Sequence, residues 1–300
     1  MRFRVSAPAS SANLGPGFDA LGLALDLWND VTVDTEGEGT VVAGSDAAQL
    51  QDKDNYTLFA MRELATLYDQ KLPPFGLELR AEVPVARGLG SSAAALVCGL
   101  MAANELAGLG LTTDQIFVEA WRMEGHGDNV GAAVYGGAIL AVPGLERAVQ
   151  LLEASSLALQ PVVFVPAATS ATWAARAALP ANVPLPDAAH NVGAASGLAV
   201  GLLTGNKEAI AAGMHDRLHE PYRARLFPHL TPMTDAARSA GAIGACLSGA
   251  GPTILALVEQ DCREAVVQAM EDVALDHHVE GRVMVLDVAP EGARLERLTD

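Results

Sequence analysis

Strands are predicted where apolar and polar side chains alternate along the chain. Residues 2–9 and 30–37 alternate in this way and end at turn-forming residues, and residues 75–83 do so just before Pro84. Residues 133–144 are mostly apolar on both sides of two glycines, which predicts a strand, a turn and a second strand. The first half of the chain is therefore expected to contain a sheet.

Two helices are predicted in the same half. Residues 92–106 are rich in Ala, Leu and Met and contain no proline and one glycine, Gly99, so this helix is expected to be buried on most sides. In residues 111–126, Thr112 precedes Gln115 by three positions, which is the spacing of a capping box at a helix start. The two helices follow one another without a strand between them.

The second half of the chain also mixes apolar strands with helical segments. A buried strand is predicted at residues 157–167, and two strands that meet at a glycine turn are predicted at 242–251 and 252–260. The remaining predictions are helices at 187–205, 206–219, 228–241 and 262–277, and a last strand with a tail over 280–298. Because there is no strict β–α–β alternation, we expect an α+β fold of two lobes, an N-terminal lobe of mixed sheet and helix over residues 1–152 and a C-terminal lobe over 153–300.

Composition narrows the class of protein. The chain has 300 residues, of which 50% are hydrophobic and 18% charged, and this is enough for a large buried core. Its formal net charge of −17 argues against nucleic acid and anionic membrane as partners. The three cysteines, Cys98, Cys246 and Cys262, form no CxxC pair, so neither a disulfide framework nor a zinc ribbon is indicated. With no signal-peptide pattern and no apolar run that could span a bilayer, a cytoplasmic protein is expected.

The segment PVARGLGSSAAA, residues 84–95, has the strand–turn–helix order of an anion-binding site. Gly88 and Gly90 let the backbone approach an anion closely, and the helix that follows begins with free backbone N–H groups. The letters GLGSSA also satisfy the dinucleotide-binding pattern G-x-G-x-x-[GA], but the expected second strand does not follow, and no Walker lysine pattern occurs. We therefore expect phosphate binding, with a purely structural turn and a dinucleotide site as the alternatives.

Two further glycine-rich segments carry polar side chains. Residues 8–25 hold Asn13 and Asp19 in a short stretch with three glycines, and residues 246–257 hold Ser248 beside two glycines. Both patterns are also ordinary turn chemistry. Taken alone, neither segment distinguishes a ligand site from a structural turn.

Together, the three segments resemble in order and spacing the motifs of the GHMP kinase family, which includes galactokinase, homoserine kinase, mevalonate kinase and phosphomevalonate kinase. The resemblance covers nearly the whole chain, and P-x-x-x-G-L-G-S-S-A-A is its most specific part. It implies a kinase that uses ATP and has a C-terminal lobe of ferredoxin-like fold. The implied nucleotide-binding residues are Asn55, Pro84, Val85, Ala86, Arg87, Gly88, Leu89, Gly90, Ser91, Ser92, Ala93, Ala94, Ser248, Gly249 and Gly251.

Within this family, the first motif resembles the homoserine kinase branch. Relatives that act on sugars or mevalonate carry a lysine where this chain has Ser10, and the run that follows matches the form P-x-[ST]-x-A-N-L-G-x-G-F-D. The run EGHGDNV, residues 124–130, resembles a second homoserine kinase motif, with Gly127 in the place of the usual proline.

The second of these runs carries implied ligands for a metal and for the substrate. By the resemblance, Glu124 and Ser92 bind Mg²⁺, an ion that prefers oxygen ligands, with Ser91 as the alternative serine. His126 and Asp128 are implied to contact the substrate. The alternative is a transition-metal cluster of Glu124, His126 and Asp128, although no further histidine lies nearby in the sequence.

Two arginines suit a substrate that has a carboxylate group. The runs TSATWAARAALP and HDRLHEPYR resemble family motifs and imply that Arg176 and Arg223 lie in the site. A planar guanidinium binds a carboxylate through two parallel hydrogen bonds. Asp19 is suited to an ammonium group, and Asn13 is implied as a further substrate ligand.

The run HDRLHEPYR can also be interpreted as part of a zinc site. His215 and His219 are four residues apart, as in H-E-x-x-H helices, but Asp216 stands where the glutamate belongs, and no third ligand is evident. A zinc protease is therefore a minor alternative.

The resemblance implies transfer of the ATP γ-phosphoryl group to the side-chain hydroxyl of L-homoserine, a step of threonine biosynthesis. A loose, metaphosphate-like transition state requires positioning and charge neutralisation more than proton abstraction, so Asn129 and Thr172 are assigned to aligning the hydroxyl. The alternatives are another small-molecule kinase of the family and a catalytically silent sensor of a nucleotide or metabolite on the same fold. The family also implies a homodimer.

Overall fold

Two long antiparallel strands form the centre of the first sheet. The computed structural model describes residues 1–44, 55–152 and 158–298. Strand β1, Arg2–Ala12, pairs with β2, Leu21–Asp34, along nearly its whole length. The other strands of this sheet are β3 Thr40–Gly44, β4 Gly76–Ala81, β5 Ala138–Leu140, β6 Val149–Leu152 and β11 Arg294–Arg297. Their order is β11-β1-β2-β4-β3, and β5 pairs with both β2 and β6.

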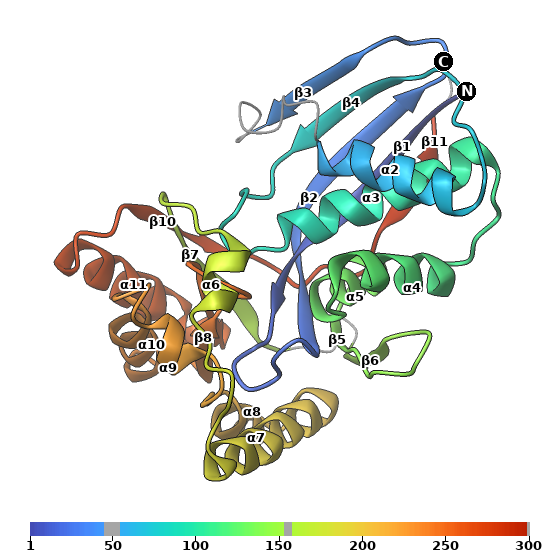
Figure 1. The fold of residues 1–300 in the computed structure, drawn as a ribbon. Coiled ribbons are helices and arrows are strands. Elements are labelled where there is room, and N and C mark those ends of the chain that lie inside the picture. Colours follow the sequence, from blue (N-terminus) through green and yellow to red (C-terminus); the bar gives the residue numbers. More distant parts are fainter. Residues whose placement is uncertain (45–54, 153–157, 299–300) are drawn as a thin grey trace.

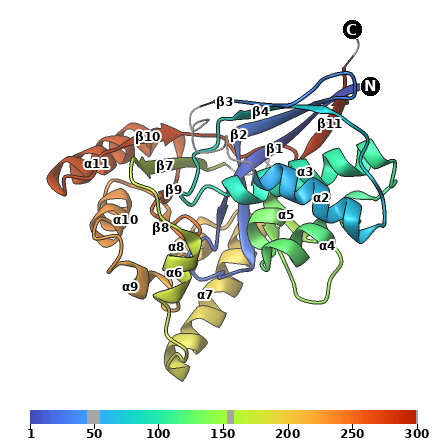
Figure 2. The ribbon, with the colours of Figure 1, turned by 45° about the horizontal axis from the view of Figure 1, so that its top comes forward.

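Four helices cover one face of this sheet (Figures 1 and 2). They are α2 Tyr56–Leu67, α3 Ser91–Ala107, α4 Thr113–Glu124 and α5 Asp128–Tyr135. Phe3 from the sheet, Leu96 from α3 and Phe117 from α4 are fully buried members of one hydrophobic cluster. The capping box of Thr112 and Gln115 is present with both of its hydrogen bonds. The two helices predicted for this half, α3 and α4, are confirmed, and α2 and α5 are additions to them.

The second sheet is antiparallel throughout, and side chains from its two faces belong to different hydrophobic clusters. Its strands are β7 Gln160–Pro166, β8 Gly244–Leu247, β9 Ile254–Val258 and β10 Gly281–Val285, in the order β10-β7-β9-β8. Its longer helices are α7 Leu185–Thr204, α8 Lys207–Gly213, α10 Leu230–Ser239 and α11 Arg263–Asp276, and its short ones are α6 Thr172–Ala177, α9 Glu220–Arg223 and the 3₁₀ turn η2 Gln260–Cys262. In β7, Val162 and Phe164 pack with α10 and α11, whereas Val163 and Val165 pack with α7 and α8. The predicted α+β fold is confirmed.

Three predicted elements differ from the structure. The strand predicted at 30–37 is only the last part of β2, which begins at Leu21 and ends at Asp34. Residues 133–135 belong to α5 and are not a strand, because a short apolar run does not by itself distinguish a strand from a buried helix. The helix expected over 206–219 ends at Gly213, since Met214 lies buried under the second sheet and the chain turns at Asp216.

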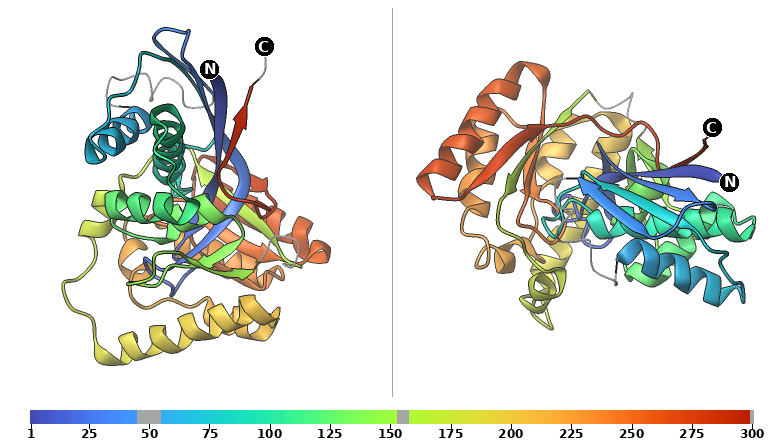
Figure 3. Two further views of the ribbon diagram at one scale, coloured as in Figure 1. Left: turned by 90° about the vertical axis from the view of Figure 1, so that its right-hand side faces the viewer. Right: turned by 90° about the horizontal axis from the view of Figure 1, so that it is seen from above.

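The C-terminal segment returns to the first sheet. The tail expected after the last strand contains β11, which lies beside β1 (Figure 3). Leu295 lies opposite Val5, and the Leu298 backbone N–H donates to the Arg2 oxygen at 2.9 Å. The predicted division between residues 152 and 153 touches residues 153–157, which lie outside the described part, and it stays a prediction. Among the described helices, none is long and apolar enough to cross a membrane.

Gly99 explains how closely α2 and α3 approach. A Cβ at this position would lie 2.4 Å from the Thr57 backbone oxygen and 2.7 Å from the Ala60 Cβ. The glycine lowers the helix propensity of α3, but it allows α2 to pack directly on it.

We predict that Gly99→Ala lowers the melting temperature although alanine is the better helix former. The overpacking should cost about 1–3 kcal/mol, more than the gain of about 1 kcal/mol in propensity. Gly193→Ala in α7 is the matched control, because its Cβ would meet nothing within 4 Å and the same gain should appear as stabilisation. Thermal unfolding followed by circular dichroism measures both, and equal shifts in the two variants would contradict the packing argument.

Candidate active site

A cavity of about 280 Å³ brings residues of both lobes together. Its wall contains polar side chains from the β1–β2 connection, from α4 and α5, and from α6 and α9. The predicted site residues that line it are Asn13, Asp19, Val85, Ala86, Gly88, Gly90, Ser91, Ser92, Glu124, His126, Asp128, Asn129, Thr172, Arg176, Arg223 and Gly249. Segments far apart in the sequence therefore share one cavity.

Two glycines shape the loop before α3. Gly90 is the N-cap of α3 with φ +68°, and a Cβ there would lie 2.0 Å from the Ser10 Oγ. Gly88 has φ +77°, and its Cβ would lie 2.4 Å from the Ser248 backbone oxygen. The loop can follow this path only with glycine at both positions, and it leaves the N-terminus of α3 at the cavity wall, where Ser91 and Ser92 lie. Backbone N–H groups and the helix dipole make this terminus suited to an anion.

Some predicted nucleotide-binding residues do not line the cavity. They are Asn55, Pro84, Arg87, Leu89, Ala93, Ala94, Ser248 and Gly251. Ala93, Ala94 and Leu89 are fully buried in the hydrophobic core. Asn55 is the N-cap of α2 and accepts a hydrogen bond from the Thr57 backbone N–H at 2.9 Å.

Ser248 and Arg87 support the loop from outside. The Ser248 hydroxyl lies 2.8 Å from the Ser11 Oγ and 2.6 Å from the Gly88 backbone oxygen. The Arg87 guanidinium donates to the backbone oxygens of Pro166 and Ala167 at the end of β7. Both residues therefore join the loop to other parts of the chain.

Ser92 and Glu124 form an oxygen-rich corner of the cavity. The Ser92 hydroxyl donates to Glu124 Oε1 at 2.8 Å, and the Tyr56 hydroxyl donates to Glu124 Oε2 at 3.1 Å. Burial and the nearby Glu124 carboxylate raise the pKa of Tyr56, so it remains a neutral donor. A hydroxyl and a carboxylate are the donor types that Mg²⁺ prefers. These residues therefore fit the predicted ion.

His126 and Asp128 are held as a pair. His126 Nδ1 lies 2.8 Å from Asp128 Oδ1, which also accepts the Asn129 backbone N–H at 2.7 Å. Burial opposes a charged imidazole, but the hydrogen bond and charge of Asp128 outweigh it, so the pKa of His126 is raised. Asn129 Oδ1 accepts the Ser10 hydroxyl at 2.8 Å, which leaves the amide Nδ2 as the group that Asn129 can offer to a ligand.

Asp19 and Arg176 form a two-point ion pair at the cavity. The Arg176 Nη1 and Nη2 atoms lie 3.1 and 2.8 Å from the two Asp19 carboxylate oxygens. This hydrogen-bonded pairing raises the pKa of Arg176. Asn13 Oδ1 accepts the Asp19 backbone N–H at 3.0 Å, and Asn13 Nδ2 donates to the Gly249 oxygen at 2.9 Å, so the third motif is joined to the first.

Arg223 differs from Arg176 because its charge is buried. It is 2% exposed, and its Nη1 donates to the Gly249 backbone oxygen at 3.1 Å. Burial lowers the pKa of this guanidinium. It makes no ion pair within 4.0 Å with any carboxylate of the described chain, and its Nη2 donates to no protein atom there. Burial raises the pKa of Glu220, on the same short helix, to about 8.

The two alternative metal sites find no support in the side-chain arrangement. Residues 215–219 are not helical, so His215 and His219 do not share a helix face. Throughout the described ranges, no three or more His, Cys, Asp and Glu side chains are grouped as metal ligands.

Six lining residues were missing from the sequence-based set: Ala12, Asn29, Tyr56, Ala95, Ser170 and Ala250. Most of them adjoin predicted residues in the sequence, so extending each motif by one position finds Ala12, Tyr56, Ala95 and Ala250. Ser170 lies in the run TSATWAARAALP, two positions before the predicted Thr172, whereas Asn29 carries no such signal. Ser170 is placed by its backbone N–H, which donates to the Ala86 oxygen at 2.8 Å.

Known proteins resemble this chain over its whole length. The family model for the GHMP kinases N terminal domain matches residues 55–137, and that for the GHMP kinases C terminal domain matches residues 198–274. A homoserine kinase of Desulfitobacterium hafniense is 40% identical over 97% of this chain and 98% of its own, and one of Synechococcus is 40% identical over the full length of both.

Solved structures agree with these sequence matches. The crystal structure of homoserine kinase from Cytophaga hutchinsonii has a TM-score of 0.86 and 30% identity to this chain, and the match covers 98% of this chain and 97% of the other. The expectation of a GHMP kinase of the homoserine kinase branch is confirmed. The chain belongs to the homoserine kinases of the GHMP kinase family.

Proposed function

We propose that the protein transfers the γ-phosphoryl group of ATP to the side-chain hydroxyl of L-homoserine, giving O-phospho-L-homoserine and ADP. The observation that carries this proposal is Arg223, a buried guanidinium at the cavity wall without a carboxylate partner in the described chain. A buried charge of this kind requires an anion, and an α-carboxylate supplies one. Relatives of 40% identity carry the same activity in their names.

The two ends of the amino acid match the charges on this side of the cavity. The carboxylate is suited to Arg223 and to Arg176, whose planar guanidinium groups can donate in pairs. The ammonium group is suited to Asp19, with Asn13 beside it. Because Asp19 and Arg176 form an ion pair with each other, a zwitterion can replace both halves of that pair at once.

The phosphates of ATP are suited to the N-terminus of α3, where Gly88 and Gly90 allow a close approach of the backbone. Ser92 and Glu124 would hold Mg²⁺ there. The bound ion would neutralise charge on the transferred phosphoryl group.

The side-chain hydroxyl of L-homoserine must also be aligned with the γ-phosphoryl group. Asn129 offers its Nδ2 donors from the start of α5, and Thr172 lies at the start of α6, on the opposite lobe. A loose transition state depends on such positioning more than on proton abstraction. We also expect the protein to be a homodimer in the cytoplasm.

We predict that purified protein with Mg²⁺ and ATP releases ADP with L-homoserine and not with mevalonate, shikimate or galactose. The reason is that only homoserine among these carries both an ammonium and a carboxylate group. A coupled ADP assay on the four acceptors measures this. Turnover with another acceptor would overturn the substrate assignment, and ATP binding without any turnover would favour a sensing protein.

We predict that Ser92→Ala and Glu124→Gln each lower kcat about a hundredfold and raise the Mg²⁺ concentration needed for half-maximal rate. The control is Glu119→Gln, since Glu119 lies on the same helix but pairs with Arg122 outside the cavity. Rates measured over a Mg²⁺ titration test this. A Mg²⁺ dependence in both variants that matches the parent protein would refute the metal assignment.

We predict that Arg176→Lys raises the KM for L-homoserine about tenfold and leaves the KM for ATP unchanged, because a lysine cannot donate in parallel to a carboxylate. Arg217→Lys is the control: Arg217 pairs with Asp187 at 3.5 Å and does not line the cavity. Steady-state kinetics with each substrate varied in turn decide the matter, and an equal rise in both KM values would argue against a carboxylate ligand.

A further inference from the structure

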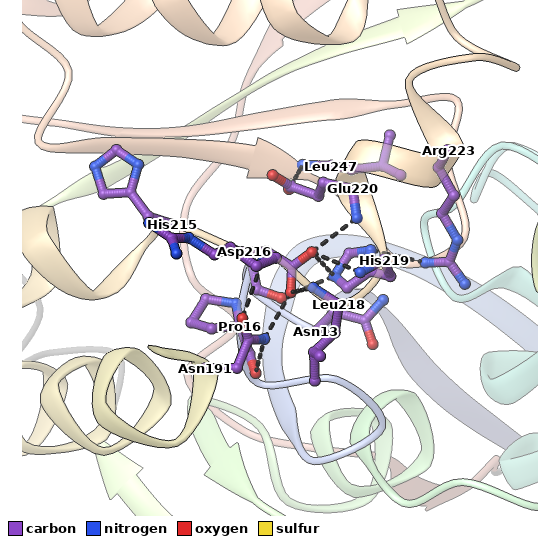
Figure 4. A network of polar contacts seen from close by, with 12 residues as sticks. Asn13, Pro16, Asn191, His215, Asp216, Leu218, His219, Glu220, Arg223 and Leu247 are labelled. Atoms are coloured by element: carbon purple, nitrogen blue, oxygen red, sulfur yellow. Dashed lines mark hydrogen bonds and ion pairs between the residues drawn. The ribbon is translucent and has the colours of Figure 1, made fainter. Parts of the chain in front are cut away.

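A network of buried polar contacts around Asp216 reaches Arg223 through His219 (Figure 4). At its centre, Asp216 Oδ2 accepts the backbone N–H groups of His219 and Glu220, both at 2.7 Å. Asp216 Oδ1 accepts the Asn191 side-chain amide at 2.7 Å and the Leu218 N–H at 3.1 Å. The Asp216 carboxylate therefore fixes the backbone that leads into α9 and presents His219.

His219 connects this network to two parts of the active site. Its ring is fully buried, with Nε2 2.8 Å from the Gly15 backbone oxygen and Nδ1 3.1 Å from Arg223 Nη1. A carbonyl oxygen only accepts and a guanidinium only donates. The imidazole must therefore be neutral, with its hydrogen on Nε2 and a free lone pair on Nδ1. Burial lowers the pKa of His219, in agreement with this assignment.

Phe18 adds an independent contact between the same groups. Its ring centroid lies 5.3 Å from that of His219, and the guanidinium carbons of Arg176 and Arg223 lie 5.4 and 5.6 Å from the Phe18 centroid. Both arginines therefore contact the same aromatic ring. Phe18 lies on the turn whose Gly15 carbonyl accepts from His219.

The contacts of Arg223 define the direction of its guanidinium. Nη1 is used by His219 Nδ1 and by the Gly249 oxygen, and Nε donates to the Ala175 oxygen at 3.3 Å. Within the described chain, the two hydrogens of Nη2 have no protein acceptor. Since a guanidinium is planar, fixing Nε and Nη1 also fixes Nη2.

We propose that His219 is a positioning residue that holds Arg223 ready for the substrate carboxylate and so makes the enzyme selective for alcohols that carry one. Its Nδ1 lone pair supplies the acceptor that orients the guanidinium, and its Nε2–H ties that orientation to the Gly15–Asp19 turn. The proposal rests on the proposed function, because it takes L-homoserine as the substrate.

Two substitutions of His219 test the contributions of its two ring nitrogens separately. His219→Asn keeps an oxygen near the position of Nδ1 and loses the bond to Gly15, whereas His219→Gln keeps a donor near Nε2 and loses the acceptor for Arg223. We expect H219Q to raise the KM for L-homoserine about tenfold, with the KM for ATP and kcat nearly unchanged, and H219N to raise it less.

An alcohol without a carboxylate distinguishes a positioning role from a merely structural one. If His219 only stabilised the fold, its substitution would change kcat/KM equally for alcohols with and without a carboxylate. We expect H219Q to lower kcat/KM for L-homoserine but not for 3-amino-1-propanol, so that the ratio of the two falls about tenfold. An equal loss for both alcohols, or equal effects of H219Q and H219N on the homoserine KM, would overturn the proposal. If the parent protein itself fails to use L-homoserine, the proposed function fails instead.

A measurement on the unchanged protein covers the case in which the variants do not fold. Long-range ¹H–¹⁵N spectra report which ring nitrogen of each histidine carries hydrogen. We expect one histidine with a neutral Nε2–H ring at pH 7 whose Nδ1 resonance shifts when L-homoserine is added. A protonated ring or the opposite tautomer at His219 would overturn the proposal.

Discussion

The active site depends on backbone contacts that are too close for a side chain. Gly88 meets the Ser248 oxygen and Gly90 meets Ser10, at positions where a Cβ would lie 2.4 and 2.0 Å away. These contacts lock the loop before α3 between β1 and the β8–β9 turn. The N-terminus of α3 in the first lobe is therefore held at a fixed place against the second lobe, which carries Arg223 and Gly249.

An acidic protein can bind an anionic nucleotide because charge acts locally. The chain has a net charge of −17, yet the acidic groups at the cavity are engaged: Asp19 pairs with Arg176, and Asp128 pairs with His126. Glu124 accepts two hydroxyl donors and is suited to a cation. The positive charge at the cavity comes from the N-terminus of α3 and from the buried Arg223. The electrostatic field of Arg223 is little screened by water.

In the segment from residue 215 to 219, which is not helical, a buried carboxylate accepts the backbone hydrogen bonds that carbonyl oxygens accept in a helix. The backbone N–H groups of Leu218 and His219, and that of Glu220 at the start of α9, donate to the Asp216 carboxylate instead of to carbonyl oxygens one turn earlier. The carboxylate thus satisfies donors that a helix start leaves free, and α9 begins just where it brings Arg223 to the cavity.

Sequence alone determined the elements and motifs whose cause is local. The capping box of Thr112 and the helix after Gly90 followed from short patterns. The resemblance to the GHMP kinases followed from three glycine-rich motifs, and it implied that Ser92 and Glu124 act together at one site, where they form a hydrogen bond. The tertiary structure alone decided that Ser248 faces Ser11 and not the cavity, that Tyr56 contacts Glu124, and that β11 pairs with β1. Ser248 and Ser11 are 237 residues apart, and periodicity reports only on neighbours within a few turns. Which way such a side chain points is decided when the two lobes pack and each buried polar group must find a partner.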